Sequence, residues 1–495
     1  MKRKVYLIDL GTGTDRGLLP LSCGLLKAYA ESNVNLSDNF DFEICMMDSS
    51  VDKLIEEIID PFVVGIACYC WNFLGSVDIS VKLKKRFPNC IIIWGGPQVP
   101  SRQHRIQKFM DENKYVDILV HGEGELTFSD VLLCIKDNKS LHFCNGITFR
   151  NGINIYTSSP RDRIKNFSTI PSPYLNGTFD NVIEKYSSYI VGALWETNRG
   201  CPYKCFEENT KIITSRCPNK KAKNVEIGDY LMCLNEKTQE ITETQVTKIF
   251  SHKAPVILEI FFEDESVIKV TPEHPFYVNK KWVEAKNLSI GDEIFEINSR
   301  EKISFNKKVM NPAKRPEVRE KISNTVIISI KTIKKETNVV NFSCYPYENY
   351  FANYILSHNC SFCDWGQALV NKVNYFEIDR VIKEIEWVSS KNIDYVYATD
   401  ANFGIKVERD LEISKNFVNI SKKNGCPKTL ILNWTKNSHQ NIVKIADVLL
   451  QGNIITNVTL SYQSVHPPVL KAIERDNIKP DYLQVLKKEY HQRHI

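Results

Sequence analysis

Short apolar runs alternate with amphipathic stretches over residues 1–135, at the spacing of β-strands followed by α-helices. Between the apolar runs, Leu21–Glu31 and Ser76–Arg86 carry apolar residues at helical spacing. This alternation predicts an α/β domain with a parallel, doubly wound (Rossmann-like) sheet, in which ligands bind where the strands end. The runs that predict strands are Val5–Leu10, Phe42–Met47, Phe62–Cys68, Cys90–Trp94 and Val116–Val120.

Residues 136–204 change in character twice. Residues 136–188 are polar and rich in turn residues, which predicts a connector, and Asn151-Gly152 between two strand-like runs predicts a hairpin turn. The Pro171-Ser172-Pro173 stretch near the end of the connector predicts a domain boundary. Residues 189–204 then begin a further domain with an apolar strand, Tyr189–Trp195.

The remaining residues predict two different folds. Residues 205–359 contain many short runs rich in Val, Ile and Phe, which predicts an all-β region. Residues 360–495 repeat a helical stretch followed by an apolar run, and these repeats predict the βα units of a partial TIM-like barrel. The helical stretches are 377–389, 409–423 and 440–451, and the apolar runs are Tyr395–Thr399, Leu430–Trp434 and Val458–Tyr462.

Length, composition and charge narrow the class of protein. The chain has 495 residues, enough for about three domains of common size. It is 43% hydrophobic and 25% charged, and its formal charge of +5 neither requires nor excludes a nucleic-acid partner. No apolar run reaches the roughly 18 residues of a membrane span, and the basic N-terminus leads into a strand and not a signal peptide. The 15 cysteines are therefore expected in the reducing cytoplasm, where metal binding or catalysis is their commoner use.

One cysteine motif is split by the all-β segment. Cys201 precedes this segment, and Cys360 and Cys363 follow it. When residues 205–359 are removed, the chain reads Cys201-Pro-Tyr-Lys-Cys360-Ser-Phe-Cys363. This Cys-x3-Cys-x-aromatic-Cys string after a first strand resembles the signature of the radical S-adenosylmethionine (SAM) enzymes. A zinc knuckle is the alternative, but it needs four ligands and the joined motif supplies three.

The resemblance implies a [4Fe–4S] cluster on Cys201, Cys360 and Cys363, with SAM on the fourth iron and Phe362 near the adenine. An external reductant then drives cleavage of SAM to a radical that takes a hydrogen atom from the substrate. The family barrel has six strands and only four are found here, so a fragment or a truncated gene product is expected. Polar residues at strand ends are candidate SAM or substrate contacts, with capping and turn formation as the alternative: Asp400, Asn402, Gln463 and Ser464.

Residues 205–359 resemble an intein, a segment that excises itself from its host protein. The resemblance implies the all-β horseshoe fold of the Hedgehog/intein family, and the last segment that carries it ends in His-Asn-Cys. The segments are, in order, Cys205–Thr214 with Ile227–Asp229, Val270–Val278, Ala285–Asp292 and Asn349–Cys360.

The intein family implies a chemical role for residues at both junctions, and this chemistry needs no cofactor. The first cysteine attacks the preceding carbonyl to form a thioester, while a threonine and a histidine stabilise the junction and deliver a proton. The cysteine after the insertion takes over the acyl group, and the last asparagine cyclises with the help of the preceding histidine. The residues implied are Cys205, Thr271, His274, His358, Asn359 and Cys360.

The insertion differs from a full-length family member at two positions and in its length. Asn341 and Glu348 stand where members often carry Asp and His, and the loss of an acid or base would slow splicing or change its limiting step. The insertion of 155 residues is too short for a complete homing endonuclease. Met310–Ser323 resembles a small DNA-binding repeat of such endonucleases; the alternative is a solvated basic helix, and no DNA contact is expected.

The N-terminal 135 residues resemble the cobalamin-binding-like domain that precedes many radical SAM enzymes. The likeness lies in Trp94–Pro97 and Gly122–Glu125, which follow predicted strands. No Asp-x-His-x-x-Gly occurs in the chain, so cobalamin binds without a protein histidine or does not bind. The residues implied in cobalamin binding are Gly11, Gly95, Gly96, Gly122, Glu123 and Gly124.

The whole sequence therefore predicts a precursor in which residues 205–359 splice out and the other 340 residues form a radical SAM enzyme. The alternative is a splicing-defective or truncated precursor that acts only as an iron–sulfur or other metal-binding protein. A Cys201–Cys205 disulfide would block the first step, so splicing is expected to be redox-gated. Methyl transfer, ring formation and methylthiolation share this cysteine motif, so the substrate cannot be read from it. No membrane partner is expected.

Overall fold

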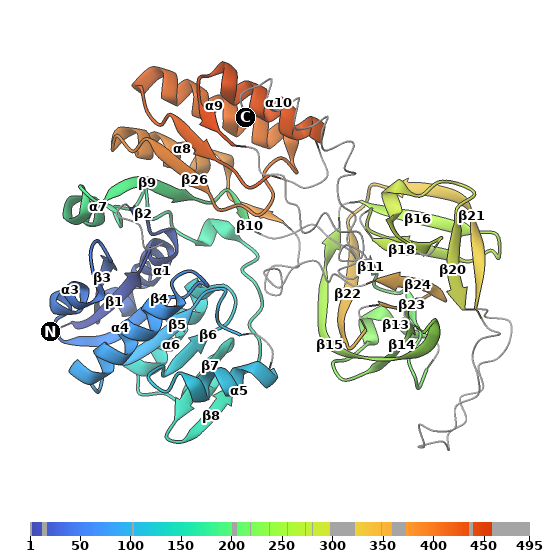
Figure 1. Ribbon diagram of the computed structural model, residues 1–495, viewed down its shortest axis with the longest axis horizontal. Helices are drawn as coiled ribbons and strands as arrows, with labels where there is room; N and C mark the ends of the chain where they lie inside the picture. The colour runs from blue at the N-terminus through green and yellow to red at the C-terminus, as the bar shows by residue number, and fades with distance from the viewer. Residues whose placement is uncertain are drawn as a thin grey trace. The chain divides into compact units, whose positions relative to one another are not determined.

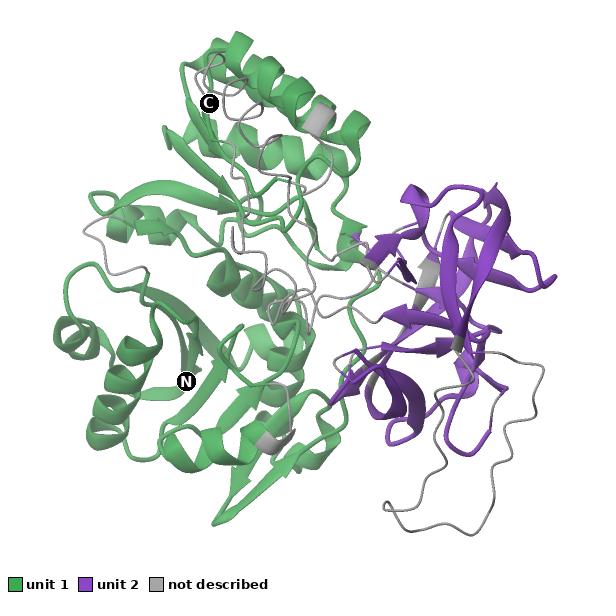
Figure 2. Cartoon of the chain, turned by 45° about the vertical axis from the view of Figure 1, so that its right-hand side comes forward, with its two compact units in different colours: residues 1–199, 374–465, 477–495 green, residues 200–373, 466–476 purple. Residues whose placement is uncertain are grey.

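The computed structural model divides the chain into two compact units (Figures 1 and 2). The first unit combines Met1–Arg199 with Asn374–Val465 and Asn477–Ile495, and the second combines Gly200–Val373 with His466–Asp476. The structure describes residues 2–11, 17–100, 103–199, 205–217, 219–236, 238–254, 256–272, 274–279, 281–297, 322–347, 349–358, 373–434 and 439–457.

A seven-stranded sheet forms the first part of unit 1, in the order β3-β1-β4-β5-β6-β7-β8 (Figure 1). The strands from β3 to β6 are parallel, and β7 and β8 are antiparallel. The predicted hairpin at Asn151-Gly152 is confirmed, and it extends this sheet. The strands are β1 (Arg3–Asp9), β3 (Phe40–Met46), β4 (Pro61–Ala67), β5 (Ile91–Gly95), β6 (Ile118–Val120), β7 (Ile147–Asn151) and β8 (Asn154–Thr157).

Helices cover both faces of this sheet, because successive residues of a strand point to opposite sides. In β1, Val5 and Leu7 belong to one apolar core, whereas Tyr6 and Ile8 belong to another. The helices α1 and α6 contribute to the first core, and α3, α4 and α5 contribute to the second. The helices are α1 (Leu21–Glu31), α2 (Val34–Ser37), α3 (Val51–Glu57), α4 (Phe73–Arg86), α5 (Gln103–Glu112) and α6 (Gly124–Lys136).

A five-stranded parallel sheet, β2-β9-β26-β27-β28, forms the second part of unit 1. Helices α8, α9 and α10 alternate with its later strands, as the sequence predicts. The strands are β2 (Gly17–Leu19), β9 (Ile190–Trp195), β26 (Tyr395–Ala398), β27 (Thr429–Ile431) and β28 (Ile455–Thr456). The helices are α7 (Asp180–Tyr186), α8 (Ile378–Ser390), α9 (Val407–Asn424) and α10 (His439–Gln451).

One detail of this sheet differs from the sequence-based expectation, and one predicted strand is not tested. Gly17–Leu19 was expected in the N-terminal domain, but it pairs with β9 because a three-residue strand carries too little pattern to reveal its partner. The strand predicted at Val458–Tyr462 lies outside the described residues. The two sides of the insertion nevertheless share one sheet, since β9 and β26 pair from Gly192 to Trp195.

The described part of unit 2 contains β-strands, two single-turn 3-10 helices (Ala222–Asn224 and Ala285–Asn287) and no α-helix, which confirms the all-β prediction for the insertion (Figure 2). The long strands β15 and β22 pair over most of their length, and Phe206, Phe276 and Phe342 lie in the core. The strands are β11 (Phe206–Glu207), β12 (Lys211–Ile212), β13 (Lys220–Lys221), β14 (Tyr230–Asn235), β15 (Glu240–Ala254), β16 (Ile257–Phe262), β17 (Val267–Val270), β18 (Pro275–Val278), β19 (Lys281–Glu284), β20 (Glu293–Ile297), β21 (Ile322–Ile333), β22 (Thr337–Tyr345), β23 (Asn349–Ala352) and β24 (Ile355–His358).

Two very short strands, β10 (Asn198–Arg199) and β25 (Asn374–Tyr375), form a separate antiparallel ladder in unit 1. They stand on either side of the insertion in the sequence.

Over the part of the chain that the structure describes, no helix is long and apolar enough to cross a membrane.

Candidate functional site

Cys205, the first residue of the insertion, is buried at the start of a short strand. Phe206 pairs with Val270 on one side and with Val340 on the other, so two strands fix the chain that leaves Cys205. The Cys205 N–H donates to the Thr271 Oγ1 at 2.9 Å, and the Cys205 carbonyl accepts from the Thr271 N–H at 2.9 Å. Thr271 therefore binds both backbone groups of the residue whose thiol is predicted to react.

His274 lies beside the same residues because of a tight turn. Its N–H donates to the Thr271 carbonyl at 3.0 Å, and its own carbonyl accepts from the Ala285 N–H at 2.7 Å. The imidazole is fully buried, with its centroid 4.0 Å from the ring of Phe206 and 5.2 Å from that of Phe276. The structure thus brings together the predicted residues of the first junction.

The last described residue of the insertion, His358, ends a hairpin of β23 and β24. Its ring meets the edge of Trp282 at a centroid distance of 4.7 Å, and only 4% of its surface is exposed. The preceding Ser357 pairs with Phe276 of β18. The strand β18 follows His274, and β17 precedes Thr271, so one continuous stretch of chain contacts both ends of the insertion.

Asn341 is buried in β22 near the first junction. Its Oδ1 accepts the hydroxyl of Tyr350 at 2.6 Å and the N–H of Phe342 at 2.7 Å. Burial raises the pKa of Tyr350, and negative charge on Cys344 and on Cys205 would raise it further. Asn341, one of the two positions expected to differ from the family pattern, therefore uses its amide as the acceptor for a buried tyrosine.

In unit 1, Asp400 binds the chain that leads into the cysteine motif. It is 1% exposed at the end of β26, and its Oδ1 accepts the N–H groups of Thr197 and Asn198 at 2.7 and 3.0 Å. Its Oδ2 accepts the Thr197 hydroxyl at 2.5 Å. Burial raises the pKa of Asp400 to about 7, although these hydrogen bonds oppose the change. The described contacts of Asp400 are structural, and a contact with SAM stays a prediction.

Arg409 of α9 holds the same segment, and sequence reasoning missed it. One of its terminal nitrogens donates to the carbonyls of Thr197 and Phe376 at 3.2 and 2.9 Å, and the other donates to the Thr197 hydroxyl at 3.2 Å. An arginine in an amphipathic helix is common, so the sequence contained no signal for this role. Asn402, a predicted SAM contact, is 6% exposed in the loop before this helix.

A second arginine, Arg199, lies two residues before Cys201, has 10% of its side-chain surface exposed and was also missed. Its Nε donates to both carboxylate oxygens of Glu196 at 2.8 and 2.9 Å, and a terminal nitrogen donates to Glu125 at 2.7 Å. Burial acts to lower the pKa of Arg199, but the two carboxylates outweigh it and raise the pKa well above its usual value. The ion pair between Arg199 and Glu125 joins α6 to the segment that begins the cysteine motif.

The glycines predicted to contact cobalamin lie at the ends of parallel strands, and close packing requires a glycine at one of them, Gly96. A Cβ on Gly96, whose φ is +106°, would lie 2.6 Å from the carbonyl oxygen of Cys68. The carboxylate of Glu123 accepts from Arg163 at 3.1 Å and from the Ile164 N–H at 2.7 Å. A Cβ on Gly124 would lie 3.0 Å from the nearest atom, and a Cβ on Gly11 or Gly95 would lie 3.4 or 3.8 Å from it, which are ordinary contact distances. A Cβ on Gly122, whose φ is +78°, would have no atom within 4 Å. These residues therefore show no feature that requires cobalamin.

Several predicted site residues lie outside the described residues, and their roles stay predictions. The described part of the chain contains no group of three or more His, Cys, Asp or Glu side chains that could hold a metal ion. Outside it lie Cys201, Glu348, Asn359, Cys360, Phe362, Cys363, Gln463 and Ser464, together with residues 310–321 of the segment Met310–Ser323, whose last two residues begin β21.

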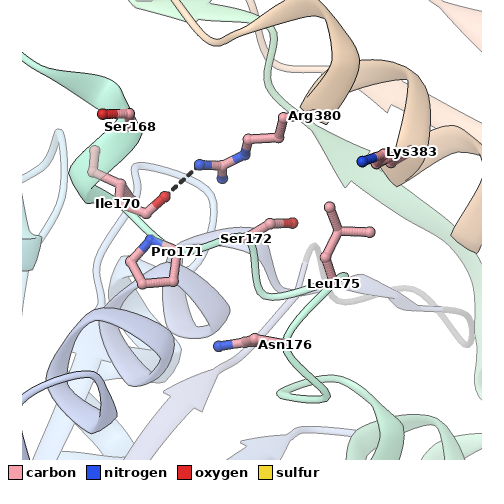
Figure 3. Close-up of a pocket in the computed structure, with 8 residues that line it drawn as sticks. All are labelled: Ser168, Ile170, Pro171, Ser172, Leu175, Asn176, Arg380 and Lys383. Carbon is pink, nitrogen blue, oxygen red and sulfur yellow. Dashed lines mark hydrogen bonds between the residues drawn. The ribbon is translucent and has the colours of Figure 1, made fainter.

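A cavity of about 350 Å³ lies in unit 1 between the connector and α8 (Figure 3). Arg380 borders it, and the guanidinium donates to the carbonyl of Ile170 and to Glu384. None of the predicted site residues lines this cavity. Its lining residues are Ser168, Ile170, Pro171, Ser172, Leu175, Asn176, Arg380 and Lys383.

Known proteins match either the insertion alone or nearly the whole chain. The model of the intein splicing domain family matches residues 212–359. The structure of a DnaB intein from Synechocystis is 18% identical, with a TM-score of 0.26, and the match covers 31% of this chain and 97% of that one.

Two methyltransferases match nearly the whole chain. A cobalamin-dependent radical SAM methyltransferase of Streptomyces tokunonensis is 24% identical over 492 residues, which are 99% of this chain and 48% of that protein. The 2-(S-pantetheinyl)-carbapenam-3-carboxylate methyltransferase of Streptantibioticus cattleyicolor is also 24% identical, over 99% of this chain and 48% of its own length. The chain thus spans about half the length of these curated relatives. It carries an intein splicing domain within a sequence that matches cobalamin-dependent radical SAM methyltransferases across nearly its full length.

Proposed function

We propose that this chain is a precursor that excises residues 205–359 and thereby completes the cysteine motif of a radical SAM methyltransferase. The observation that carries the proposal is the pair of hydrogen bonds between Cys205 and Thr271, both at 2.9 Å, in a region that matches the intein splicing family. They hold in place the residue whose peptide bond must be cleaved.

The first step exchanges an amide for a thioester. The Cys205 thiol attacks the Lys204 carbonyl, the bond from that carbon to the Cys205 nitrogen breaks, and the nitrogen takes up a proton. Thr271 holds this nitrogen through its Oγ1, and His274 supplies the proton. Because a thioester is less stable than an amide, the step needs groups that favour the leaving amine.

The later steps join the host residues, which are those outside 205–359. The Cys360 thiol displaces the Cys205 thiol from the acyl carbon, and the side-chain nitrogen of Asn359 then attacks its own carbonyl carbon. The Cys360 nitrogen leaves as an amine, next to His358, and finally takes the acyl group from sulfur. The contacts of Cys205 and Ser357 with the β17–β18 stretch support this route, because one segment binds both ends of the insertion.

The joined product supplies three thiolates, from Cys201, Cys360 and Cys363, which fits a [4Fe–4S] cluster that leaves one iron for SAM. When bound, the cluster supplies the electron for reductive cleavage of SAM. Asp400 and Arg409 fix the chain before Cys201. We interpret the first sheet as a Rossmann-like domain and the second as a partial TIM-like barrel.

Methyl transfer is the reaction class that the relatives support, with cobalamin as a further cofactor. The packing of Gly96 and Glu123 offers no independent support for cobalamin, so no step is derived through it. The proposed partners are a reductant and a substrate that the described residues do not identify.

An intact-mass spectrum of the chain, expressed anaerobically with reductant, tests the proposal. Splicing replaces the 57.1 kDa chain by a fragment of 155 residues and a product of 340 residues that contains Lys204–Cys360. A variant with Cys205→Ala and Asn359→Ala, which blocks both cleavage steps, is the control and should keep its full mass. If the unmodified chain also keeps its full mass, splicing is refuted, and the amide at Asn341 becomes the first position to change.

A further inference from the structure

The host residues on the two sides of the insertion touch each other in the uncut chain. Asn198 pairs with Tyr375, and Arg199 pairs with Asn374, in the antiparallel ladder of β10 and β25. Asn198 and Arg199 precede Cys205 by only a few positions. A ladder this short has little stability of its own, so other contacts must hold it.

Buried hydrogen bonds next to the ladder provide these contacts. The Phe376 N–H donates to the Thr197 carbonyl at 3.0 Å. The Arg409 guanidinium donates to the carbonyls of both residues and so bridges the two sides of the insertion. Thr197 is 0%, Phe376 3% and Arg409 8% exposed. Because these donors and acceptors are shielded from water, breaking the bridge leaves polar groups unpaired.

Aromatic and ionic contacts add to the same arrangement. The Arg199 guanidinium lies 5.8 Å from the centre of the Phe376 ring, and that of Arg409 lies 4.9 Å from the Tyr375 ring. The Asp400 carboxylate also accepts hydrogen bonds from the N–H and the hydroxyl of Thr197. We call this set the clasp: β10, β25, Thr197, Phe376 and Arg409.

We propose that the clasp promotes splicing, by keeping the two host flanks together until they are ligated. This inference rests on the proposed splicing function and adds a role for host residues, with Arg409 as a positioning residue. The flanks between the clasp and the junctions are residues 200–204 and 360–373, five and fourteen residues long. Five extended residues reach at most about 17 Å, so Lys204 cannot move far from the clasp.

The clasp matters most for the transfer of the acyl group from Cys205 to Cys360. In this step water competes with the Cys360 thiol for the thioester, and hydrolysis releases residues 1–204 from the rest of the backbone. Holding both flanks at one point raises the effective concentration of the thiol. The clasp should therefore change the ratio of ligation to cleavage and leave the first step unchanged.

The experiment compares Arg409→Gln with a matched control, Arg150→Gln, in the full-length chain. Arg150 also donates to two backbone carbonyls in unit 1, those of Met110 and Val116, but it lies in the first sheet, outside the clasp. Intact-mass spectra over time give the amounts of ligated product and of the 1–204 fragment. Thiol-induced cleavage in an Asn359→Ala, Cys360→Ala background gives the rate of the first step.

We expect Arg409→Gln to lower the ratio of ligation to cleavage about threefold or more, with an unchanged first step, while Arg150→Gln changes neither. If Arg409→Gln unfolds unit 1, the clasp is lost all the same and the expected ratio is the same. An unchanged ratio, or an equal fall in both variants, overturns the inference. Absence of any splicing in the unmodified chain instead refutes the proposed function, and the inference falls with it.

Discussion

Replacing Thr271 by valine is the sharpest test of the first junction, because valine has the same shape and lacks the hydroxyl. The Thr271 Oγ1 accepts the Cys205 N–H at 2.9 Å, across 66 positions of sequence. Both residues are nearly inaccessible, at 4% and 1% exposure, so water cannot replace the lost acceptor. The variant therefore removes the acceptor that Thr271 gives to this buried N–H.

The size of the effect follows from the cost of losing this acceptor. Removing the acceptor of a buried donor costs about 1–3 kcal/mol, and valine offers no compensating acceptor. If the hydroxyl stabilises the leaving nitrogen by this amount in the transition state, the first step slows by about 5- to 150-fold, since about 1.4 kcal/mol corresponds to tenfold. Thr271→Ser keeps the hydroxyl and should retain most of the rate.

The assay is thiol-induced cleavage at Lys204–Cys205, followed by mass spectrometry, in a chain with Asn359→Ala and Cys360→Ala so that later steps cannot interfere. Thr214 provides the structural control. Its Oγ1 accepts the Cys217 N–H at 2.9 Å and donates to the Cys217 carbonyl at 2.9 Å, and it is 3% exposed. Thr214→Val thus removes a similar hydrogen bond away from the junction.

The reasoning is refuted if Thr271→Val cleaves as fast as the unmodified chain. It is also refuted if Thr214→Val slows cleavage by the same factor, because the effect would then reflect a general loss of stability in unit 2. A selective loss at Thr271 that serine restores would assign the hydroxyl a direct part in the first step.

Three further predictions concern other parts of the molecule. His274→Ala should slow thiol-induced cleavage at least about tenfold, because it removes the proton donor, and an unchanged rate would exclude that role. Asn341→Asp should shorten the half-life of the precursor, measured by intact mass; a longer half-life would show that the amide is the better group there. Burial raises the pKa of Asp400 from 3.8 to about 7, so the folded chain holds this proton more tightly and its stability falls as pH rises between these values. Asp400→Asn should remove up to about 4 kcal/mol of this fall. Urea unfolding at pH 4.5 and 7.5 gives the free energy of unfolding at each pH. An equal change in this free energy between the two pH values in both chains would contradict the prediction.

The sequence by itself predicted where the insertion begins and ends, and the family model matches residues 212–359 of it. The proposed splicing places its reactive groups at the junctions, so Cys205 and the His358-Asn359-Cys360 terminus are adjacent in sequence to the bonds that it would change. The strand–helix alternation of unit 1 was also readable, because the periodicity of buried residues is a local property.

Only the tertiary structure decided how distant polar residues are used. From the sequence, Asp400 at a strand end could contact either a ligand or another part of the chain. In the structure its described hydrogen bonds come from Thr197 and Asn198. The pairing of Gly17–Leu19 with β9 was hidden for a similar reason, since three residues have no period.

The clasp shows the limit most clearly. Its strands have two residues each and stand on opposite sides of the insertion, so neither their length nor their spacing marks them as partners. They meet because β9 and β26 lie side by side in the second sheet and because Arg409 bridges Thr197, which follows β9, and Phe376, which follows β25. Non-local pairing of this kind depends on the folding of the whole unit, and no local pattern in the chain encodes it.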